Sequence, residues 1–197
     1  MAEQDINLEE IKKQCIFCHI VAGRVASKKV FEDPKVTAVL DINPGNPGHV
    51  LLLPKEHYAI MPQIPDEEIG HLSMNSKAIS ASLLRAVKCH GTTIFIANGV
   101  AAGQRAQHFM MHIIPRMEND GLGIELQENK ISSDKLIELK KQLLPSIKKA
   151  LGSAVELLPQ ESNQEVIQKK EDKPEDKQPK QKKSDSPLDD IARLLGA

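Results

Sequence analysis

Residues 107–114, which read Q-H-F-M-M-H-I-I, constrain the fold more than any other stretch of the chain. The segment has an apolar run and no charged residue, and its period of two is typical of a β-strand. Side chains alternate between the two faces of a strand, so His108, Met110 and His112 should line one surface while the residues between them fill the core. From this segment alone two interpretations stay open: a binding surface with imidazoles, or a buried strand whose histidines are hydrogen-bonded internally.

A loop of small residues precedes this segment. Residues 98–104 read N-G-V-A-A-G-Q, and their backbone N–H groups can come close to a bound anion because few side chains stand in the way. A loop of this kind leading into a histidine-bearing strand suggests a phosphate site with imidazoles beside it.

Charge and hydropathy argue against several classes of partner. The 197 residues carry a formal net charge of −1, so no overall field favours nucleic acid or a membrane surface. The chain has no run of about 18 apolar residues, and its acidic first residues M-A-E-Q-D do not resemble a signal peptide. We therefore expect a cytoplasmic protein with no membrane or nucleic-acid partner.

The three cysteines favour metal binding or redox chemistry over a disulfide framework. Residues 1–14 are polar and form an N-terminal extension, after which Cys15 and Cys18 make a C-x-x-C pair, while Cys89 stands alone. An odd number of cysteines without a secretory signal argues against structural disulfides. Cys15 and Cys18 are therefore candidates for metal binding or for thiol–disulfide exchange.

Periodicity predicts an α+β fold. Residues 65–87 have helical spacing of apolar side chains and an acidic first turn, which the helix dipole favours. In addition to the histidine segment, four stretches read as strands, at residues 30–33, 36–41, 49–54 and 92–97. Strands on both sides of one long helix are typical of the α+β class.

A C-terminal helical extension is expected over residues 130–158. Ser132 or Ser133 can cap a helix over residues 134–151, and Gly152 can close it. This helix lies outside the alternating strand pattern and is therefore predicted to extend the domain.

The rest of the chain is predicted to be a tethered peptide. Residues 159–186 consist of Lys, Glu, Gln, Asp and Pro with almost no apolar side chains, so they should form a disordered charged linker. Residues 187–197 should form a short amphipathic helix that binds a protein partner, although packing on its own domain and an inert end stay open. Its apolar stripe consists of Leu188, Ile191, Leu194 and Leu195.

Several motifs in the same order resemble the histidine-triad (HIT) family of nucleotide-binding proteins, across residues 15–120. They are C-I-F-C at 15–18, P-G-H-V-L-L-L-P-K-E-H at 47–57, A-G-Q at 102–104 and I-I-P-R at 113–116. The resemblance implies a HIT-like domain over residues 15–126, with a five-stranded antiparallel sheet and a long helix. It also implies a homodimer that binds a purine nucleotide and reacts at the α-phosphate.

The resemblance assigns the nucleotide site. The carboxylate of Asp41 would meet the ribose hydroxyls, and His49 and His112 would flank the phosphate. The phosphates would be held through side-chain amides and backbone N–H groups of Asn98, Gly103 and Gln104. The base would lie between the side chains of Ile16, Phe17 and Ile20.

One departure from the family pattern decides the expected activity. The middle histidine of H-x-H-x-H attacks phosphorus in such enzymes, and here that position holds Met110. A thioether neither forms the labile phosphorus–nitrogen intermediate nor carries a proton, so hydrolysis should be lost or weakened. The alternative is an active nucleotide phosphohydrolase or nucleotidyltransferase that uses His112 or an activated water. A third reading makes the folded part a scaffold for the tail.

A subset of the family suggests structural zinc. Cys15 and Cys18 supply two thiolates, and His57 with His108 would complete a tetrahedral Cys₂His₂ site. His108 and His112 are about 13 Å apart along one strand, so one metal cannot take both. A thioredoxin-like redox role for the cysteine pair is disfavoured, because the sequence around it lacks the βαβ context of such proteins. The spacing between His108 and His112 also disfavours a copper(I) site formed by His108, Met110 and His112.

Overall fold

The computed structural model describes residues 8–123 and 128–152 of the chain. Contacts divide the protein into two compact units, residues 1–127 and 128–197, and each is described by itself. None of the described helices combines the length and the apolar character that crossing a bilayer requires.

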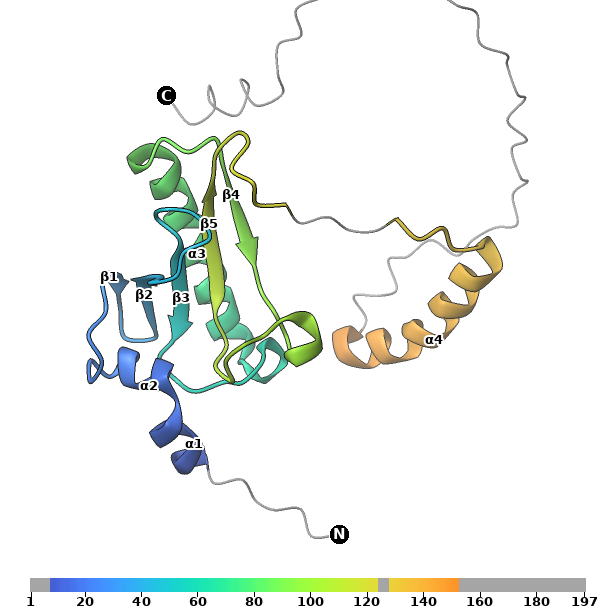
Figure 1. Ribbon diagram of the computed structural model, residues 1–197. Coiled ribbons are helices and arrows are strands. Elements are labelled where there is room, and N and C mark those ends of the chain that lie inside the picture. The colour runs from blue at the N-terminus through green and yellow to red at the C-terminus, as the bar shows by residue number, and fades with distance from the viewer. Residues whose placement is uncertain (1–7, 124–127, 153–197) are drawn as a thin grey trace, which may run out of the picture. The chain divides into compact units, whose positions relative to one another are not determined.

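The first unit is built on a five-stranded antiparallel sheet, which confirms the predicted fold (Figure 1). The strands lie in the order β1-β2-β3-β5-β4, so β3 and β5 are central and β4 is an edge. Their bounds are β1 (Lys29–Glu32), β2 (Val36–Leu40), β3 (Val50–Pro54), β4 (Gly91–Phe95) and β5 (Met111–Arg116).

Strand β3 is buried on both faces, which explains its unbroken apolar sequence. On one face, helix α3 (Asp66–Ala86) packs across β3, β4 and β5, and Leu52 joins the main core there. On the other face, Leu51 and Leu53 form a smaller cluster with side chains of the short helix α2 (Ile16–Val21). Because both faces are buried against apolar side chains, the sequence of β3 is a continuous apolar run and does not alternate between apolar and polar residues.

The remaining elements of this unit are short. Helix α1 (Leu8–Gln14) comes just before α2, and it lies in the segment predicted to be an N-terminal extension. Two 3₁₀ turns, η1 (Met61–Gln63) and η2 (Val100–Ala102), flank α3 and β4 along the chain. Helix α3 begins after Pro65 with three acidic residues in its first turn, as its sequence predicted.

The histidine strand is shorter than predicted. Strand β5 starts at Met111, so His108 and Met110 lie in an irregular segment before it and the expectation of a strand from residue 107 was wrong. The backbone N–H of Phe109 donates to the Tyr58 carbonyl (2.6 Å) and not to a neighbouring strand. Side-chain alternation nevertheless continues through the segment, because Phe109 and Met111 both belong to the core against α3.

The loop between β2 and β3 is fixed to the end of β5. The side-chain amide of Asn46 donates to the Pro115 carbonyl (2.9 Å) and to Asp120 (2.8 Å). Gly48 has a φ of +93°, a backbone conformation that residues with a side chain rarely adopt, so this turn favours glycine. The loop therefore presents its flanking residues in a defined position.

The described part of the second unit contains helix α4 (Ser133–Leu151). Ser132 caps it, because its hydroxyl accepts a hydrogen bond from the Lys135 N–H (3.3 Å). None of its described side chains is buried. The predicted linker at 159–186 and the terminal helix at 187–197 lie outside the described residues, and the domain boundaries stay predictions.

Candidate functional site

Four sulfur and nitrogen donors meet where α2 approaches the end of β3. Cys18 Sγ lies 3.3 Å from His57 Nδ1 and 3.6 Å from His108 Nδ1, and Cys15 Sγ lies 3.5 Å from the same His108 atom. All four donor atoms lie within 4.8 Å of one another. The structure thus brings together the four residues that the sequence suggested as metal ligands.

The second nitrogen of His108 fixes how its ring faces the cluster. Its Nε2–H can donate to the Pro54 carbonyl (3.2 Å), which leaves the Nδ1 lone pair directed at the thiols. Burial lowers the pKa of His108 to about 4, and burial together with the Cys15 thiol raises the pKa of Cys18 to about 12. Without a cation both groups would be neutral, whereas a metal ion would hold Cys18 as a thiolate.

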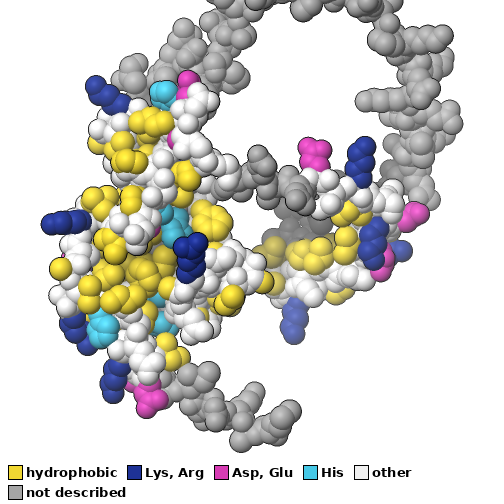
Figure 2. All heavy atoms as spheres, viewed as in Figure 1, with side chains coloured by type: hydrophobic (Ala, Val, Ile, Leu, Met, Phe, Trp, Pro, Cys, Tyr) yellow, Lys and Arg dark blue, Asp and Glu magenta, His cyan; other side chains and the backbone are white. Residues whose placement is uncertain are grey.

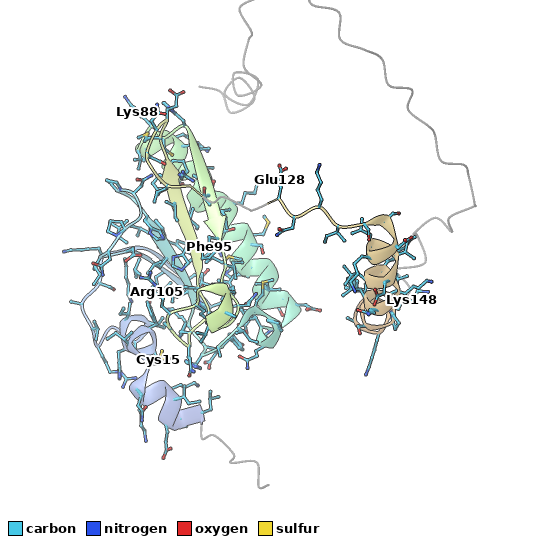
Figure 3. All side chains as sticks on the ribbon, turned by 45° about the vertical axis from the view of Figure 1, so that its right-hand side comes forward. Cys15, Lys88, Phe95, Arg105, Glu128 and Lys148 are labelled. Carbon is cyan, nitrogen blue, oxygen red and sulfur yellow. The ribbon has the colours of Figure 1, made fainter. Side chains whose placement is uncertain are left out.

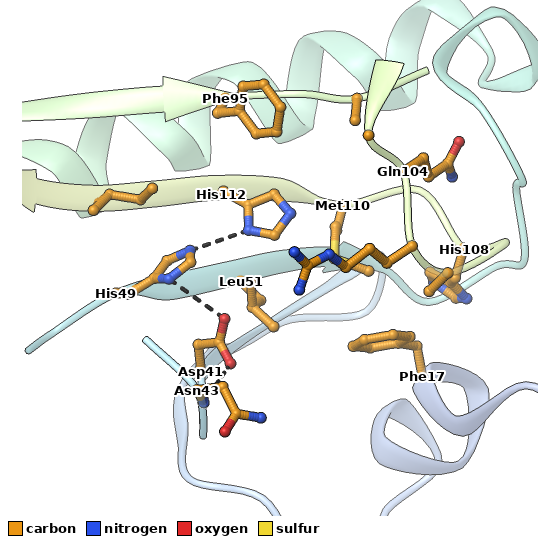
Figure 4. Close-up of a pocket in the computed structure, with 15 residues that line it drawn as sticks. Phe17, Asp41, Asn43, His49, Leu51, Phe95, Gln104, His108, Met110 and His112 are labelled. Carbon is orange, nitrogen blue, oxygen red and sulfur yellow. Dashed lines mark hydrogen bonds and ion pairs between the residues drawn. The ribbon is translucent and has the colours of Figure 1, made fainter. Parts of the chain in front are cut away.

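A cavity of about 450 Å³ opens beside this cluster, on the face of the sheet opposite α3 (Figure 4). Phe17 of α2 and Phe95 of β4 lie on opposite sides of it, with Met110 and His112 between them. Figure 2 shows histidine side chains among hydrophobic atoms on the visible face of this unit. The other lining residues are Asp41, Asn43, His49, Leu51, Ala97, Gly103, Gln104, Arg105, Ala106, His108 and Ile114.

Three side chains form a continuous polar chain at one end of the cavity. Asp41 Oδ2 lies 3.4 Å from His49 Nδ1, and His49 Nε2 lies 3.1 Å from His112 Nδ1. The Gly45 N–H also reaches His49 Nδ1, at 3.2 Å. The same set of Asp41, His49 and His112 can also converge on a cation.

The proton on His49 decides what His112 presents to a ligand. If His49 Nδ1–H donates to Asp41, then His49 Nε2 accepts from His112, and His112 Nε2 keeps a lone pair. If His49 Nδ1 instead accepts from Gly45 N–H, the roles reverse and His112 Nε2 carries a proton. His112 can therefore accept from or donate to a ligand in the cavity.

Burial keeps both imidazoles uncharged near neutral pH. It is the main cause that lowers the pKa of His49 and of His112, while the carboxylate of Asp41 opposes the shift in both. The proximity of His49 lowers the pKa of His112 further.

Comparison with known proteins places the chain in a family. A model of the HIT domain matches residues 22–119. A HIT-like protein of Methanocaldococcus jannaschii, itself uncharacterised, is 41% identical over 116 residues, which cover 59% of this chain and 89% of that protein. This chain belongs to the HIT domain family.

Two further relatives are informative about the family. Adenosine 5′-monophosphoramidase HNT1 of Saccharomyces cerevisiae is 35% identical over 134 residues, which cover 68% of this chain and 82% of the enzyme. A crystal structure of a zinc-bound histidine-triad family protein from Mycobacterium smegmatis superposes with a TM-score of 0.55 at 28% identity, covering 68% of this chain and 98% of that one.

The HIT domain brings most of the expected nucleotide-site residues to one cavity. Phe17, Asp41, His49, Gly103, Gln104 and His112 all line it. Three expected residues are not among the lining residues, namely Ile16, Ile20 and Asn98. The side chain of Ile16 is half exposed, and that of Ile20 packs in the apolar cluster of Leu51 and Leu53.

The loop amides of the HIT domain already have partners within the protein. Gln104 Oε1 accepts from the Gly99 N–H (2.6 Å), its Nε2 donates to the Ala59 carbonyl (2.6 Å), and Asn98 Oδ1 accepts from the Met61 N–H (2.9 Å). The backbone N–H groups of Gly103 and Gln104 are also bonded, to carbonyls of the same loop. These groups therefore shape the loop, and their expected role on phosphate stays a prediction.

Sequence reasoning missed several lining residues. Phe95 reaches the cavity because β4 pairs with β5 in a register that sets it opposite His112. Only the strand register shows this contact. Arg105 also lines the cavity and directly follows the G-Q motif. Its positive charge beside an expected phosphate-binding loop could have indicated this position from the sequence.

The pKa shifts predict an NMR titration. The Hε1 signals of His49 and His112 should titrate with midpoints below pH 6.5, because burial disfavours the charged imidazolium. Asp41→Asn should lower the His49 midpoint further by removing the carboxylate that opposes this shift, whereas Asp66→Asn on α3, outside the cavity lining, should leave it unchanged. Midpoints above 6.5 in the wild type would contradict the assignment.

Proposed function

We propose that the protein binds a purine nucleotide in this cavity and hydrolyses it slowly or not at all. The observation that carries the proposal is the convergence of Asp41, His49, His112 and Phe17 on one cavity. The relation to a monophosphoramidase, an enzyme that acts on an adenosine nucleotide, supports it.

Each group suits a different part of a nucleotide. Asp41 uses Oδ1 to accept the Asn43 N–H (2.9 Å) and still has lone pairs for two ribose hydroxyls. The aromatic face of Phe17 offers a stacking surface for the base, a role that passes to it because Ile16 and Ile20 do not line the cavity. His49 and His112 then lie beside the α-phosphate.

Met110 is the reason that turnover should be weak. It lines the cavity next to His112, and its side chain also packs with the apolar cluster of Leu51 and Leu53. A thioether at this position provides contact surface but no nucleophile for a covalent intermediate. The domain would then hold its ligand, as a sensor or adaptor does.

The polar chain favours a second candidate function. With a proton on His49 Nδ1, His112 Nε2 has a free lone pair that could attack phosphorus or activate a water. An active phosphohydrolase or nucleotidyltransferase therefore stays the alternative.

We also propose that the four-donor cluster holds a structural zinc ion. A tetrahedral zinc with Zn–S near 2.3 Å and Zn–N near 2.05 Å separates sulfur from nitrogen ligands by about 3.6 Å. The three sulfur–nitrogen distances of 3.3, 3.5 and 3.6 Å fit this value. The zinc-bound family structure supports the choice of metal. Cys15, Cys18, His57 and His108 would fill all four positions, which leaves none for a reaction.

Our proposals about protein partners rest on the edge strand β4 and on residues 187–197. Strand β4 is an edge strand, and Ile94 and Phe95 on it are partly exposed, so pairing of two β4 edges would give the expected homodimer. The protein partner of residues 187–197 and the cytoplasmic location stay predictions from the sequence.

Nucleotide binding should depend on Asp41. We expect Asp41→Ala to weaken AMP binding about tenfold or more, because charge-assisted hydrogen bonds to the ribose are lost. Asp66→Ala removes an equivalent charge at an exposed residue of α3 outside the cavity lining and should bind like the wild type. Isothermal titration calorimetry measures both, with melting temperatures as a check on folding. Equal affinity in the two variants would refute the site.

Turnover should respond to the residue at position 110. With adenosine phosphoramidate and diadenosine polyphosphates, Met110→His should raise the rate on the order of 100-fold or more, because it supplies a nucleophile. Met74→His places a histidine on the exposed surface of α3 and should change nothing. If the wild type already turns over as fast as Met110→His, the enzyme alternative is right.

Purified protein should contain about one zinc ion per chain. Cys18→Ser should remove the metal, whereas Cys89→Ser, at a buried cysteine outside the donor cluster, should keep it. Elemental analysis gives the zinc content. Because structural zinc contributes directly to folding, chelation should lower the melting temperature by several degrees or more, on the order of 2–4 °C for each kcal/mol lost. An unchanged melting curve after verified removal would reject a structural role.

A further inference from the structure

The two cysteines of the donor cluster differ in their access to solvent. Cys18 is buried, with 9% of its surface exposed, whereas Cys15 is partly exposed and lines a second cavity of about 280 Å³. Side chains of α1 and α2 line this second cavity, together with His57 and residues 106–107. Figure 3 shows Cys15 where the chain passes from α1 to α2. A small molecule in the second cavity therefore meets Cys15 and not Cys18, which is not among the lining residues.

The two sulfur atoms are close enough to be joined after a small movement. All donor atoms of the cluster lie within 4.8 Å of one another, which sets an upper bound on the distance from Cys15 Sγ to Cys18 Sγ. A disulfide brings two sulfur atoms to about 2.05 Å. The C-x-x-C spacing is compatible with that bond, because thioredoxin-like proteins form a disulfide at the same spacing.

The backbone at Cys15 is held in place while its side chain can turn toward Cys18. Cys15 is the N-cap of α2 and has an extended conformation, with φ −79° and ψ 113°, and Cys18 lies in the first turn of that helix. The Cys15 N–H donates to the Ile11 carbonyl (3.0 Å), and the Cys15 carbonyl accepts from the His19 N–H (3.2 Å). Because these bonds join main-chain atoms, rotation about the Cα–Cβ bond of Cys15 can move its sulfur without unwinding α2.

A disulfide and a zinc ion at this cluster exclude each other. Zinc binds cysteine as the thiolate, and a sulfur atom in a disulfide no longer carries that charge. Oxidation of the pair would leave His57 and His108 as the remaining ligands of the cluster, two of the four that a closed structural site needs. Formation of the disulfide therefore expels the metal.

We propose that Cys15 and Cys18 form a site of reversible oxidation, at which a peroxide converts the two metal-bound thiolates into a disulfide and releases the metal. This inference rests on the proposed zinc ion and adds a modification of its ligands. It differs from a thioredoxin-like role, because the sulfur atoms react with a small oxidant and not with the disulfide of a protein substrate. The partial exposure of Cys15 and the burial of Cys18 assign the two steps of the reaction.

The reaction balances with hydrogen peroxide as the oxidant. The Cys15 thiolate attacks one oxygen, the O–O bond breaks, and a sulfenic acid and a hydroxide ion form. The Cys18 thiolate then attacks the Cys15 sulfur and displaces a second hydroxide ion as the S–S bond forms. Each sulfur atom has lost one electron, and the peroxide has gained both. Two thiolates, one hydrogen peroxide and the bound zinc thus give one disulfide, two hydroxide ions and a free zinc ion.

The test follows the zinc and the thiols of the full-length, zinc-loaded protein after hydrogen peroxide is added. A chromogenic chelator measures the released zinc, and alkylation followed by tryptic digestion identifies the oxidised cysteines. Cys15 and Cys18 share one tryptic peptide, residues 14–24, whereas Cys89 lies in another, residues 89–105. We expect the loss of about one zinc ion for each disulfide formed within residues 14–24. A thiol reductant with added zinc should restore both the metal content and the alkylation.

Two variants separate the pair from the other sulfur and nitrogen groups. Cys89→Ser should release zinc like the wild type, because Cys89 is buried and lies outside the donor cluster. Cys15→His keeps a zinc ligand at the exposed position but removes the thiol that the disulfide needs. Peroxide should therefore release zinc from Cys15→His about tenfold more slowly than from the wild type.

Each outcome has a defined meaning. Release of zinc together with a disulfide inside residues 14–24 supports the proposal. Zinc that stays bound in peroxide, zinc that leaves without this disulfide, or a disulfide between two chains refutes the oxidation site while the zinc proposal stands. Release from Cys15→His at the wild-type rate also refutes it, and if that variant binds no zinc, the disulfide mapping of the wild type decides. If the purified wild type contains no zinc, the proposed zinc site and this inference both fail.

Discussion

Burial of β3 on both faces is the constraint on which the rest of the structure depends. Leu52 packs against the α3 side and Leu51 and Leu53 against the α2 side, so the register of the strand cannot shift without exposing one of these clusters. A histidine of the polar chain, His49, lies just before the strand, and a histidine of the donor cluster, His57, lies just after it. Because the strand fixes both ends at once, the polar chain and the four-donor cluster are held at a constant separation.

The short irregular segment before β5 connects the two sites. His108 faces the thiols while His112, four residues on, faces the cavity, and Met110 lies between them against the apolar cluster. Helix α2 also links the two sites. Its adjacent residues Phe17 and Cys18 belong to the cavity wall and to the donor cluster, respectively. A metal ion that fastens α2 to the sheet would therefore also hold the aromatic wall of the cavity.

The polar groups of the cavity support the proposed binding of a nucleotide. A carboxylate, two imidazoles and an aromatic ring line the cavity, and they would offer complementary contacts to a ribose, a phosphate and a base. The position that would need a nucleophile for a covalent reaction holds a thioether. His112 has a lone pair in only one of its two tautomers, so any residual reaction would depend on which group pairs with His49.

The sequence by itself predicted an α+β fold with one long helix, because hydrophobic period and turn residues are local signals, and the five-stranded antiparallel sheet was implied by the resemblance to the family. It also named the four residues of the donor cluster and six residues that line the cavity, through motifs whose order resembles one family. Only the tertiary structure decided where β5 begins, since the Phe109 N–H pairs with a carbonyl that is 51 positions away in the chain, that of Tyr58. It likewise decided that the Gln104 amide holds the loop and that Phe95 enters the cavity, because hydrogen-bond partners and strand register are set by non-local packing.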